Sequence, residues 1–179
     1  MKPLRFDRIR IQALLQTAGD RLAGEWLVIG GAAAAAWFSP SRTTEDIDLI
    51  NLAGTQEARL ALMELAADAS IPIEAVNSAA DFFVRRIAGW RDQLVELMRG
   101  TSAVIYRPSA TLFLLLKLER LSEADLDDCL MMIAHCAQTG ESVDVARVVA
   151  RLDSLPNTDD LLLARRREAF RDALVGPAG

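Results

Sequence analysis

The stretch from Trp26 to Ile50 constrains the fold of this chain more than any other part of the sequence. A short apolar run over 25–29 is bounded by glycines, which is typical of a buried strand. The double glycine Gly30-Gly31 ends this strand abruptly, and a helix of very small residues is predicted over 32–38. Small residues let a helix lie close to a sheet, so this stretch predicts a tight strand–turn–helix unit.

A second predicted strand, 46–52, carries two aspartates one residue apart. Alternation along a strand places Asp46 and Asp48 on one face and Ile47 and Leu49 on the other. Two carboxylates on one side of a strand are costly unless a cation lies beside them. Mg²⁺ is a hard cation that takes oxygen ligands and leaves room for substrate phosphates, so this pair predicts a magnesium site.

The glycine turn adds a second half to this predicted site. Backbone N–H groups at the start of a helix can cradle a triphosphate, and Gly30-Gly31 stands where such a turn is needed. A carboxylate pair and a phosphate cradle together predict metal-assisted phosphoryl or nucleotidyl transfer. Each half alone is a weak signal, because both Asp-x-Asp and Gly-Gly are common in ordinary turns.

Two halves of different character follow from the hydrophobic periodicity. Residues 1–107 read as a mixed α/β core and residues 108–179 as a helical region packed on it, which gives an α+β fold class. Helices are predicted over 6–23, 55–69, 109–121, 123–138, 142–152 and 158–174, and strands over 71–76, 94–98 and 103–106. The last two strands form a hairpin around Gly100, whereas 78–92 fits a strand or a helix equally well.

Composition narrows the possible functions. The 179 residues are 51% hydrophobic but contain neither an apolar run long enough to span a membrane nor a signal peptide, so we expect a cytoplasmic protein without membrane contact. The net charge of −5 argues against a large nonspecific nucleic-acid footprint. Cys129 and Cys136 lie two helical turns apart, too far for a disulfide, and His135 is the only histidine, which excludes an ordinary zinc site.

The order of these motifs resembles a known signature. Strand, Gly-Gly, helix and then Arg-Thr-x-x-Asp-x-Asp on the next strand is similar to the DNA polymerase β-like nucleotidyltransferase superfamily, and in particular to nucleotidyltransferases related to the AbiEii type IV toxins. The resemblance covers residues 26–50 and extends more loosely over 107–133. It implies a nucleotidyltransferase-like mixed sheet with flanking helices, followed by a C-terminal helical bundle.

The resemblance also implies roles for individual residues. Gly30 and Gly31 would contact the triphosphate, Asp46 and Asp48 would be catalytic and ligate Mg²⁺, and an NTP would be the substrate. The remaining nucleotide-binding residues it implies are Arg42 and Thr43, ahead of the aspartates, and Lys117, Asp125 and Asp128 in the helical half. Of these, Lys117 would also be catalytic, because it would reach the phosphates. Without the resemblance, the residue types also allow structural roles. Lys117 could snorkel from an apolar helix, and Asp125 could be only a helix cap beside Ser122.

A third catalytic carboxylate is expected on a later strand, and here the sequence departs from the family pattern. Glu96 and Glu74 are the candidates, and neither is the usual aspartate. Glu96 is preferred because an acid within an apolar strand has few structural reasons to be there. The alternative is an edge-strand glutamate that faces water.

Two functions remain open at this point. The first is a Mg²⁺-dependent nucleotidyltransferase that moves an NMP from an NTP to a hydroxyl on RNA, protein or a small molecule. For this function the resemblance implies a toxin–antitoxin context with an antitoxin-type protein partner. The second is a catalytically weak or inactive module that keeps the fold and acts through nucleotide or protein binding. The arginine runs Arg85-Arg86 and Arg165-Arg166-Arg167 could bind phosphates, but such runs are more often a solvated face.

Overall fold

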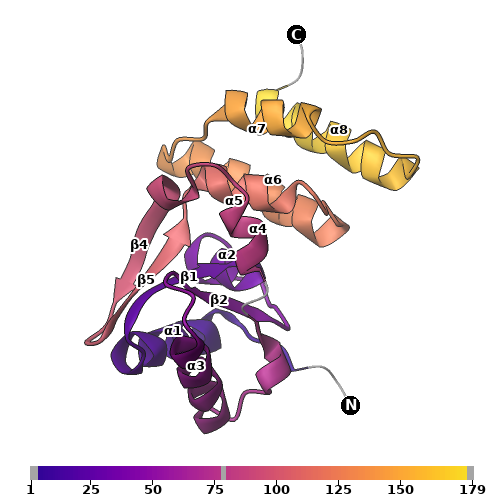
Figure 1. Cartoon of the computed structure of the whole chain (residues 1–179). Coiled ribbons are helices and arrows are strands. Elements are labelled where there is room, and N and C mark those ends of the chain that lie inside the picture. Colours follow the sequence, from indigo (N-terminus) through magenta and orange to yellow (C-terminus); the bar gives the residue numbers. More distant parts are fainter. Residues whose placement is uncertain (1–3, 78–79, 177–179) are drawn as a thin grey trace. The chain divides into compact units, whose positions relative to one another are not determined.

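The chain divides into two compact units, which we describe separately. The computed structural model describes residues 4–77 and 80–176. The first unit runs from Met1 to Pro108 and the second from Ser109 to Gly179. The first unit is a mixed sheet with helices and the second is helical, so the fold is α+β as predicted (Figure 1).

The first unit is built on a mixed five-stranded sheet with the strand order β3-β2-β1-β5-β4. The strand β1 lies at its centre, antiparallel to β2 and parallel to β5, and the four residues from Trp26 to Ile29 are all buried. Burial on both faces explains why this strand reads as an unbroken apolar run rather than an alternating one. The strands are β1 (Gly24–Ile29), β2 (Ile47–Asn51), β3 (Val76–Asn77), β4 (Leu94–Arg99) and β5 (Ala103–Pro108).

Three helices of the first unit pack into one apolar core with this sheet. The core joins the buried face of α1 and the alanines of α2 to Val28, Leu49 and Ile105. Asp7 caps α1 through a hydrogen bond from the Arg10 backbone N–H at 2.9 Å. The helices of this unit are α1 (Arg8–Arg21), α2 (Gly30–Trp37), α3 (Gln56–Asp68) and α4 (Asp81–Arg85), with short 3₁₀ turns η1 (Ile73–Ala75) and η2 (Trp90–Gln93).

The predicted strand over 71–76 is wrong for most of its length. Residues 73–75 form the 3₁₀ turn η1, and only Val76 and Asn77 pair with β2 as β3. Pro72 stands just before η1 with φ −55°, a value that suits the start of a helical turn as well as a strand end. The ambiguous segment 78–92 contains the helix α4 and the start of η2, and its residues 78 and 79 lie outside the described residues.

The predicted hairpin is confirmed, and its turn packs against the end of α1. Strands β4 and β5 are antiparallel, and Ser102 N–H donates to the Gly19 carbonyl at 3.0 Å. Thr101 N–H donates to Asp20 Oδ1 at 3.0 Å, and hydrogen bonds from Gln16 and Thr101 lower the pKa of Asp20. A Cβ on Gly100 would lie 2.1 Å from the Gly19 carbonyl carbon, so the two backbones are in direct contact.

We predict that Gly100→Ala lowers the free energy of unfolding by about 1–3 kcal/mol or more, because the added methyl group meets backbone that cannot move aside. Urea-induced unfolding followed by circular dichroism measures this loss. Ser102→Ala in the same turn is the control, because Ser102 is exposed and its contact with α1 is made by the backbone. Equal stability of the two variants would contradict the close packing of the hairpin on α1.

The second unit consists of four helices, whose boundaries follow strong capping signals. Ser122 and Asp125 form the predicted capping box at the start of α6, and Gly140 ends this helix with φ 75°. Ser109 and Asp160 cap α5 and α8 through their side chains. The helices are α5 (Ala110–Lys117), α6 (Glu123–Thr139), α7 (Val145–Asp153) and α8 (Leu161–Val175). No helix in the described part of the chain has the length and apolar character needed to cross a membrane.

Candidate functional site

The two aspartates lie at the start of β2, on the strand next to the central one. Ile47 and Leu49 are fully buried, whereas Asp48 between them is only partly buried and Asp46, one residue before the strand, is exposed. The predicted alternation is therefore confirmed for Asp48 and its neighbours. Asp48 faces Ile29, the last residue of β1, in the antiparallel register.

This register brings the Asp48 carboxylate to the glycine turn at the start of α2. A Cβ on Gly30 would lie 2.7 Å from Asp48 Oδ2, closer than a side chain can approach, and Gly30 has φ +65°. Only glycine meets both conditions without strain. The carboxylate therefore lies beside the N-terminus of a helix, where the helix dipole favours negative charge.

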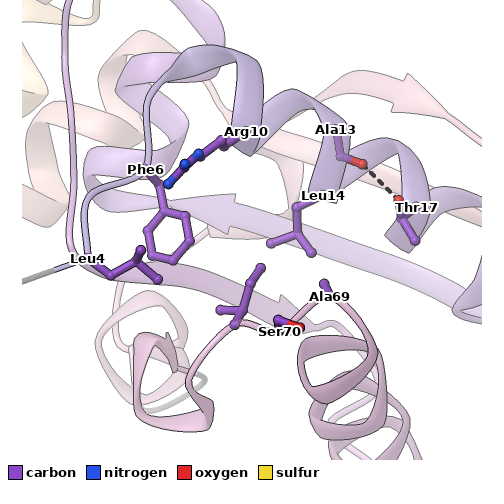
Figure 2. Close-up of a pocket in the computed structure, with 9 residues that line it drawn as sticks. Leu4, Phe6, Arg10, Ala13, Leu14, Thr17, Ala69 and Ser70 are labelled. Carbon is purple, nitrogen blue, oxygen red and sulfur yellow. Dashed lines mark hydrogen bonds between the residues drawn. The ribbon is translucent and has the colours of Figure 1, made fainter.

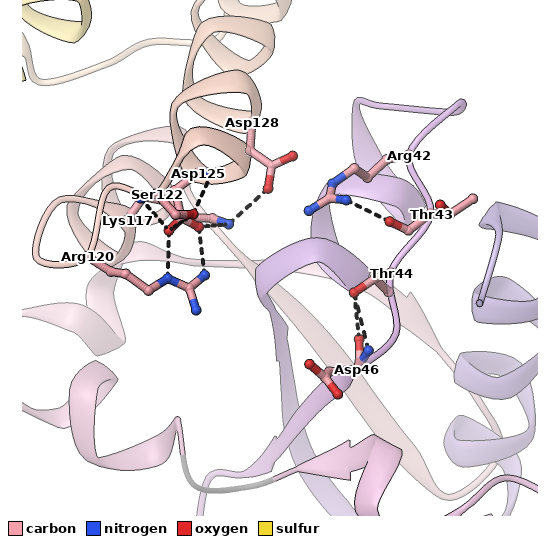
Figure 3. A network of polar contacts seen from close by, with 9 residues as sticks. All are labelled: Arg42, Thr43, Thr44, Asp46, Lys117, Arg120, Ser122, Asp125 and Asp128. Carbon is pink, nitrogen blue, oxygen red and sulfur yellow. Dashed lines mark hydrogen bonds and ion pairs between the residues drawn. The ribbon is translucent and has the colours of Figure 1, made fainter. Parts of the chain in front are cut away.

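The segment before the aspartates folds against the second glycine of the turn. A Cβ on Gly31 would lie 2.8 Å from Thr44 Oγ1 and 3.5 Å from Arg42 Nη2. The Arg42 guanidinium donates to the Thr43 carbonyl at 2.7 Å, so it is held over its own loop (Figure 3). The predicted residues Gly31 and Arg42 are thus neighbours, while the described hydrogen bond of Thr43 is made by its backbone.

Thr44 is a residue of this site that the sequence-based prediction missed. Its hydroxyl donates to the Asp46 carbonyl at 3.0 Å and lies 3.4 Å from the Asp46 backbone nitrogen (Figure 3). The backbone of Thr44 also exchanges hydrogen bonds of 2.8 and 3.0 Å with Phe6, ahead of α1. Threonine hydroxyls often bond to the backbone two residues further on in turns, and this tendency could have identified Thr44.

The structure does not bring the expected third carboxylate to the aspartates. Glu96 lies on β4 at the edge of the sheet, is exposed, and pairs with Arg99 at 2.6 Å. Strands β1 and β5 lie between β4 and β2, a separation of roughly 14 Å at the usual strand spacing. Glu96 thus corresponds to the edge-strand alternative.

Glu74 is exposed in η1, just before the short strand that pairs with β2. Within residues 4–77 and 80–176, no three histidine, cysteine, aspartate or glutamate side chains are grouped so as to hold a metal ion.

Lys117, Asp125 and Asp128 do come together, in the second unit. Lys117 Nζ lies 2.8 Å from Asp125 Oδ1 and 2.9 Å from Asp128 Oδ2, and all three side chains are buried (Figure 3). Arg120 adds two hydrogen bonds to Asp125, at 2.7 and 2.9 Å, and the Ser122 hydroxyl adds another at 2.8 Å. We call these five residues the Lys117 cluster.

The Lys117 cluster settles two of the alternatives that the sequence leaves open. Lys117 does not snorkel to water, because only 8% of it is exposed and its ammonium group lies between two carboxylates. Asp125 is both the N3 residue of the capping box at the start of α6 and a member of the polar cluster. Two cations and two carboxylates balance within the cluster, so Lys117 carries no excess positive charge toward a phosphate.

The electrostatics of the cluster shift the pKa of Asp125. Burial alone would raise this pKa, but the hydrogen bonds from Arg120 and the charge and hydrogen bond of Lys117 outweigh burial and hold it well below its ordinary value. Asp125 therefore remains ionised in the folded protein at neutral pH.

We predict that Asp125→Asn lowers the free energy of unfolding at pH 7 by about 3 kcal/mol, because it leaves Lys117 and Arg120 short of a buried counter-charge. The folded pKa lies below the unfolded value of about 3.9, so the stabilisation by Asp125 is full above that pH and declines as the pH falls below about 4. The difference in the free energy of unfolding between wild type and variant should therefore become smaller as the pH falls below about 4.

Urea unfolding at a series of pH values measures this gap, with Asp127→Asn as control. Asp127 lies on the same helix but is exposed. A gap that stays constant down to pH 3, or an equal loss in the control, would contradict the role given to Asp125.

The two cysteines are free thiols, as predicted, and both are buried. Burial of Cys129 is the largest effect on its thiol and raises its pKa to about 12, although the positive charge of Lys117 acts in the opposite direction. A thiol with so high a pKa is almost entirely protonated at neutral pH, and the protonated form is a poor nucleophile.

We predict that Cys129 in a Cys136→Ala background does not react with a disulfide reagent at pH 8 until the protein unfolds. The absorbance of the released thiolate, followed with and without urea, measures this protection. The Cys129→Ala variant, which keeps Cys136, is the comparison. Rapid stoichiometric reaction of native Cys129 would contradict its burial.

A cavity of about 440 Å³ lies elsewhere on the first unit, between α1 and the segment that follows α3 (Figure 2). Its lining is mostly apolar and includes Leu4, Phe6, Leu14 and Ile71, with Arg10 as a charged member. None of the predicted site residues lines this cavity.

No protein-family model, curated protein or solved structure matches this chain. The nucleotidyltransferase resemblance therefore remains a prediction from the motifs.

Proposed function

We propose that the chain is a Mg²⁺-dependent nucleotidyltransferase that moves an NMP from an NTP to a hydroxyl acceptor. The observation that carries this proposal is the approach of the Asp48 carboxylate to the Gly30 turn at the start of α2. A carboxylate that could bind a metal ion thus lies beside a helix N-terminus that could bind phosphates. The carboxylate is at the start of β2, whereas the helix follows the end of β1.

The donor chemistry of this place suits the proposed metal. Asp46 and Asp48 offer carboxylate oxygens, and Asp48 Oδ2 lies beside Gly30, the first residue of α2, where a phosphate would bind. A carboxylate alone would repel that phosphate, so a divalent cation between them is the natural complement. Mg²⁺ bound by the aspartates would neutralise the phosphate charge and activate the attacking hydroxyl.

Two further residues of the first unit, Arg42 and Thr44, would bind the phosphates and position a carboxylate. Arg42 lies next to Gly31 and supplies a guanidinium for phosphate oxygens. The Thr44 hydroxyl holds the backbone of Asp46, which orients that carboxylate. Roles for Thr43, Lys117, Asp125 and Asp128 at the nucleotide, and a toxin–antitoxin context with an antitoxin-type partner, rest on the family resemblance alone.

A second candidate is a catalytically weak or inactive module that binds nucleotide or protein. Two placements favour it over a full enzyme. Glu96, the preferred third carboxylate, is paired with Arg99 on the edge strand β4. Lys117 is engaged by Asp125 and Asp128, so its proposed reach to phosphates would require it to leave two buried ion pairs.

We predict that the purified chain, incubated with each α-³²P-labelled NTP, Mg²⁺ and total RNA or protein, transfers label to an acceptor. Asp48→Asn should abolish the transfer, because it removes the negative charge but keeps the shape beside Gly30. Glu64→Gln is the matched control, since Glu64 is an exposed carboxylate on α3 in the same unit.

Isothermal titration with each NTP in Mg²⁺ separates the two candidates. Binding without transfer favours the inactive module, with Asp48→Asn weakening the binding. Neither binding nor transfer with any NTP would overturn both the enzyme and the nucleotide-binding form of the module.

A further inference from the structure

The surface around α4 combines exposed aromatic rings with arginines in a way that the proposed function does not use. Phe82 is 62% exposed and Phe83 is 52% exposed, and their rings pack edge to face with centroids 5.6 Å apart. Two aromatic rings in contact on the surface form an exposed apolar patch, the kind of feature that marks interaction sites. This pair therefore indicates a surface that meets a partner.

A guanidinium lies against one of these rings. Arg86 is exposed and its Cζ lies 5.3 Å from the Phe82 ring centroid, within the range of a cation–π contact. Among the described residues, no carboxylate forms an ion pair with Arg86. Its N–H groups therefore remain open to an anion, while its flat face is held by Phe82.

Two further arginines are held beside this surface in the same manner. Arg91 and Arg85 lie 4.6 and 5.7 Å from the Trp90 ring, and each donates to the Leu52 carbonyl at 3.3 Å. Asp81 pairs with Arg85 at 2.7 Å and neutralises that charge, which leaves Arg86 and Arg91 as the cations available to a ligand. We call Phe82, Phe83, Arg86 and Arg91 the α4 surface.

We propose that the α4 surface binds single-stranded nucleic acid. Each nucleotide of a single strand offers one phosphate and one flat unpaired base, which complement a guanidinium and an exposed ring. Stacking of bases on aromatic side chains needs no particular sequence, and arginine adds both charge and a planar face. A duplex offers phosphates but keeps its bases stacked internally, so it would engage only the arginines.

The local charge agrees with this ligand although the whole chain is acidic. Segment 81–93 holds Arg85, Arg86 and Arg91 against Asp81 and Asp92, an excess of one positive charge in a chain of net charge −5. A purely apolar protein partner would leave the guanidinium of Arg86 without an acceptor, at a cost. The inference does not depend on nucleotidyl transfer, because binding can be measured without an NTP.

Fluorescence anisotropy of the full chain with labelled single strands of about twelve nucleotides tests this proposal. The arms are single-stranded RNA, single-stranded DNA, the corresponding duplex and a polyglutamate peptide. We expect both single strands to bind more tightly than the duplex or the peptide. A difference between the RNA and DNA arms would identify which of the two the surface prefers.

Two variants of the α4 surface should affect single-strand binding in different ways. Phe82→Ala/Phe83→Ala should weaken single-strand binding by at least about fivefold through lost stacking. Arg86→Gln should weaken it and also reduce the slope of log affinity against log salt by about 0.7, the value for one phosphate contact.

The matched control is Arg59→Gln/Leu60→Ala, an exposed arginine and an exposed apolar residue on α3 of the same unit. It should bind as wild type does, and thermal melting should show all variants folded. Absence of single-strand binding at low salt, equal loss in the control, or tighter binding of duplex or polyglutamate would overturn the proposal. Failure here would leave the proposed nucleotidyl transfer untouched, since that is read by labelling with Asp48→Asn.

Discussion

The approach of Asp48 to Gly30 is the contact on which the candidate site depends. Antiparallel pairing of β1 with β2 places Ile29 opposite Asp48, so the end of one strand and the start of the other must meet. The chain can then turn directly into α2 only if the first residue of the turn lacks a side chain and accepts a positive φ. The sheet register therefore fixes both the position of the Asp48 carboxylate and the need for glycine at position 30.

The two groups of acidic residues in this chain differ in their electrostatic state. Lys117, Asp125 and Asp128 are buried in the Lys117 cluster, and its two cations balance its two carboxylates, an arrangement that joins α5 to α6. Asp46 and Asp48 are more open, and Asp46 is held through its backbone by Thr44. The difference agrees with the proposal that Asp46 and Asp48 bind a ligand, whereas Asp125 and Asp128 pair with cations of their own unit.

Local patterns in the sequence predicted local structure well. The strand before Gly30, the alternation around Asp48 and the capping box at Ser122 each depend on residues within a few positions of one another, and each is confirmed. The position of Glu96 depends instead on which strands lie between β4 and β2, which periodicity does not encode. The pairing of Lys117 was likewise hidden, because it depends on the distance from α5 to two aspartates on α6.

The backbone hydrogen bonds between Phe6 and Thr44 connect the candidate site to the segment before α1. Thr44 forms hydrogen bonds with Phe6 on one side and with Asp46 on the other. The position of the loop that carries Asp46 is therefore coupled to the position of the segment before α1. Phe6 is also part of the wall of the cavity beside α1. A displacement of that segment would therefore be transmitted over two residues to a carboxylate of the candidate site.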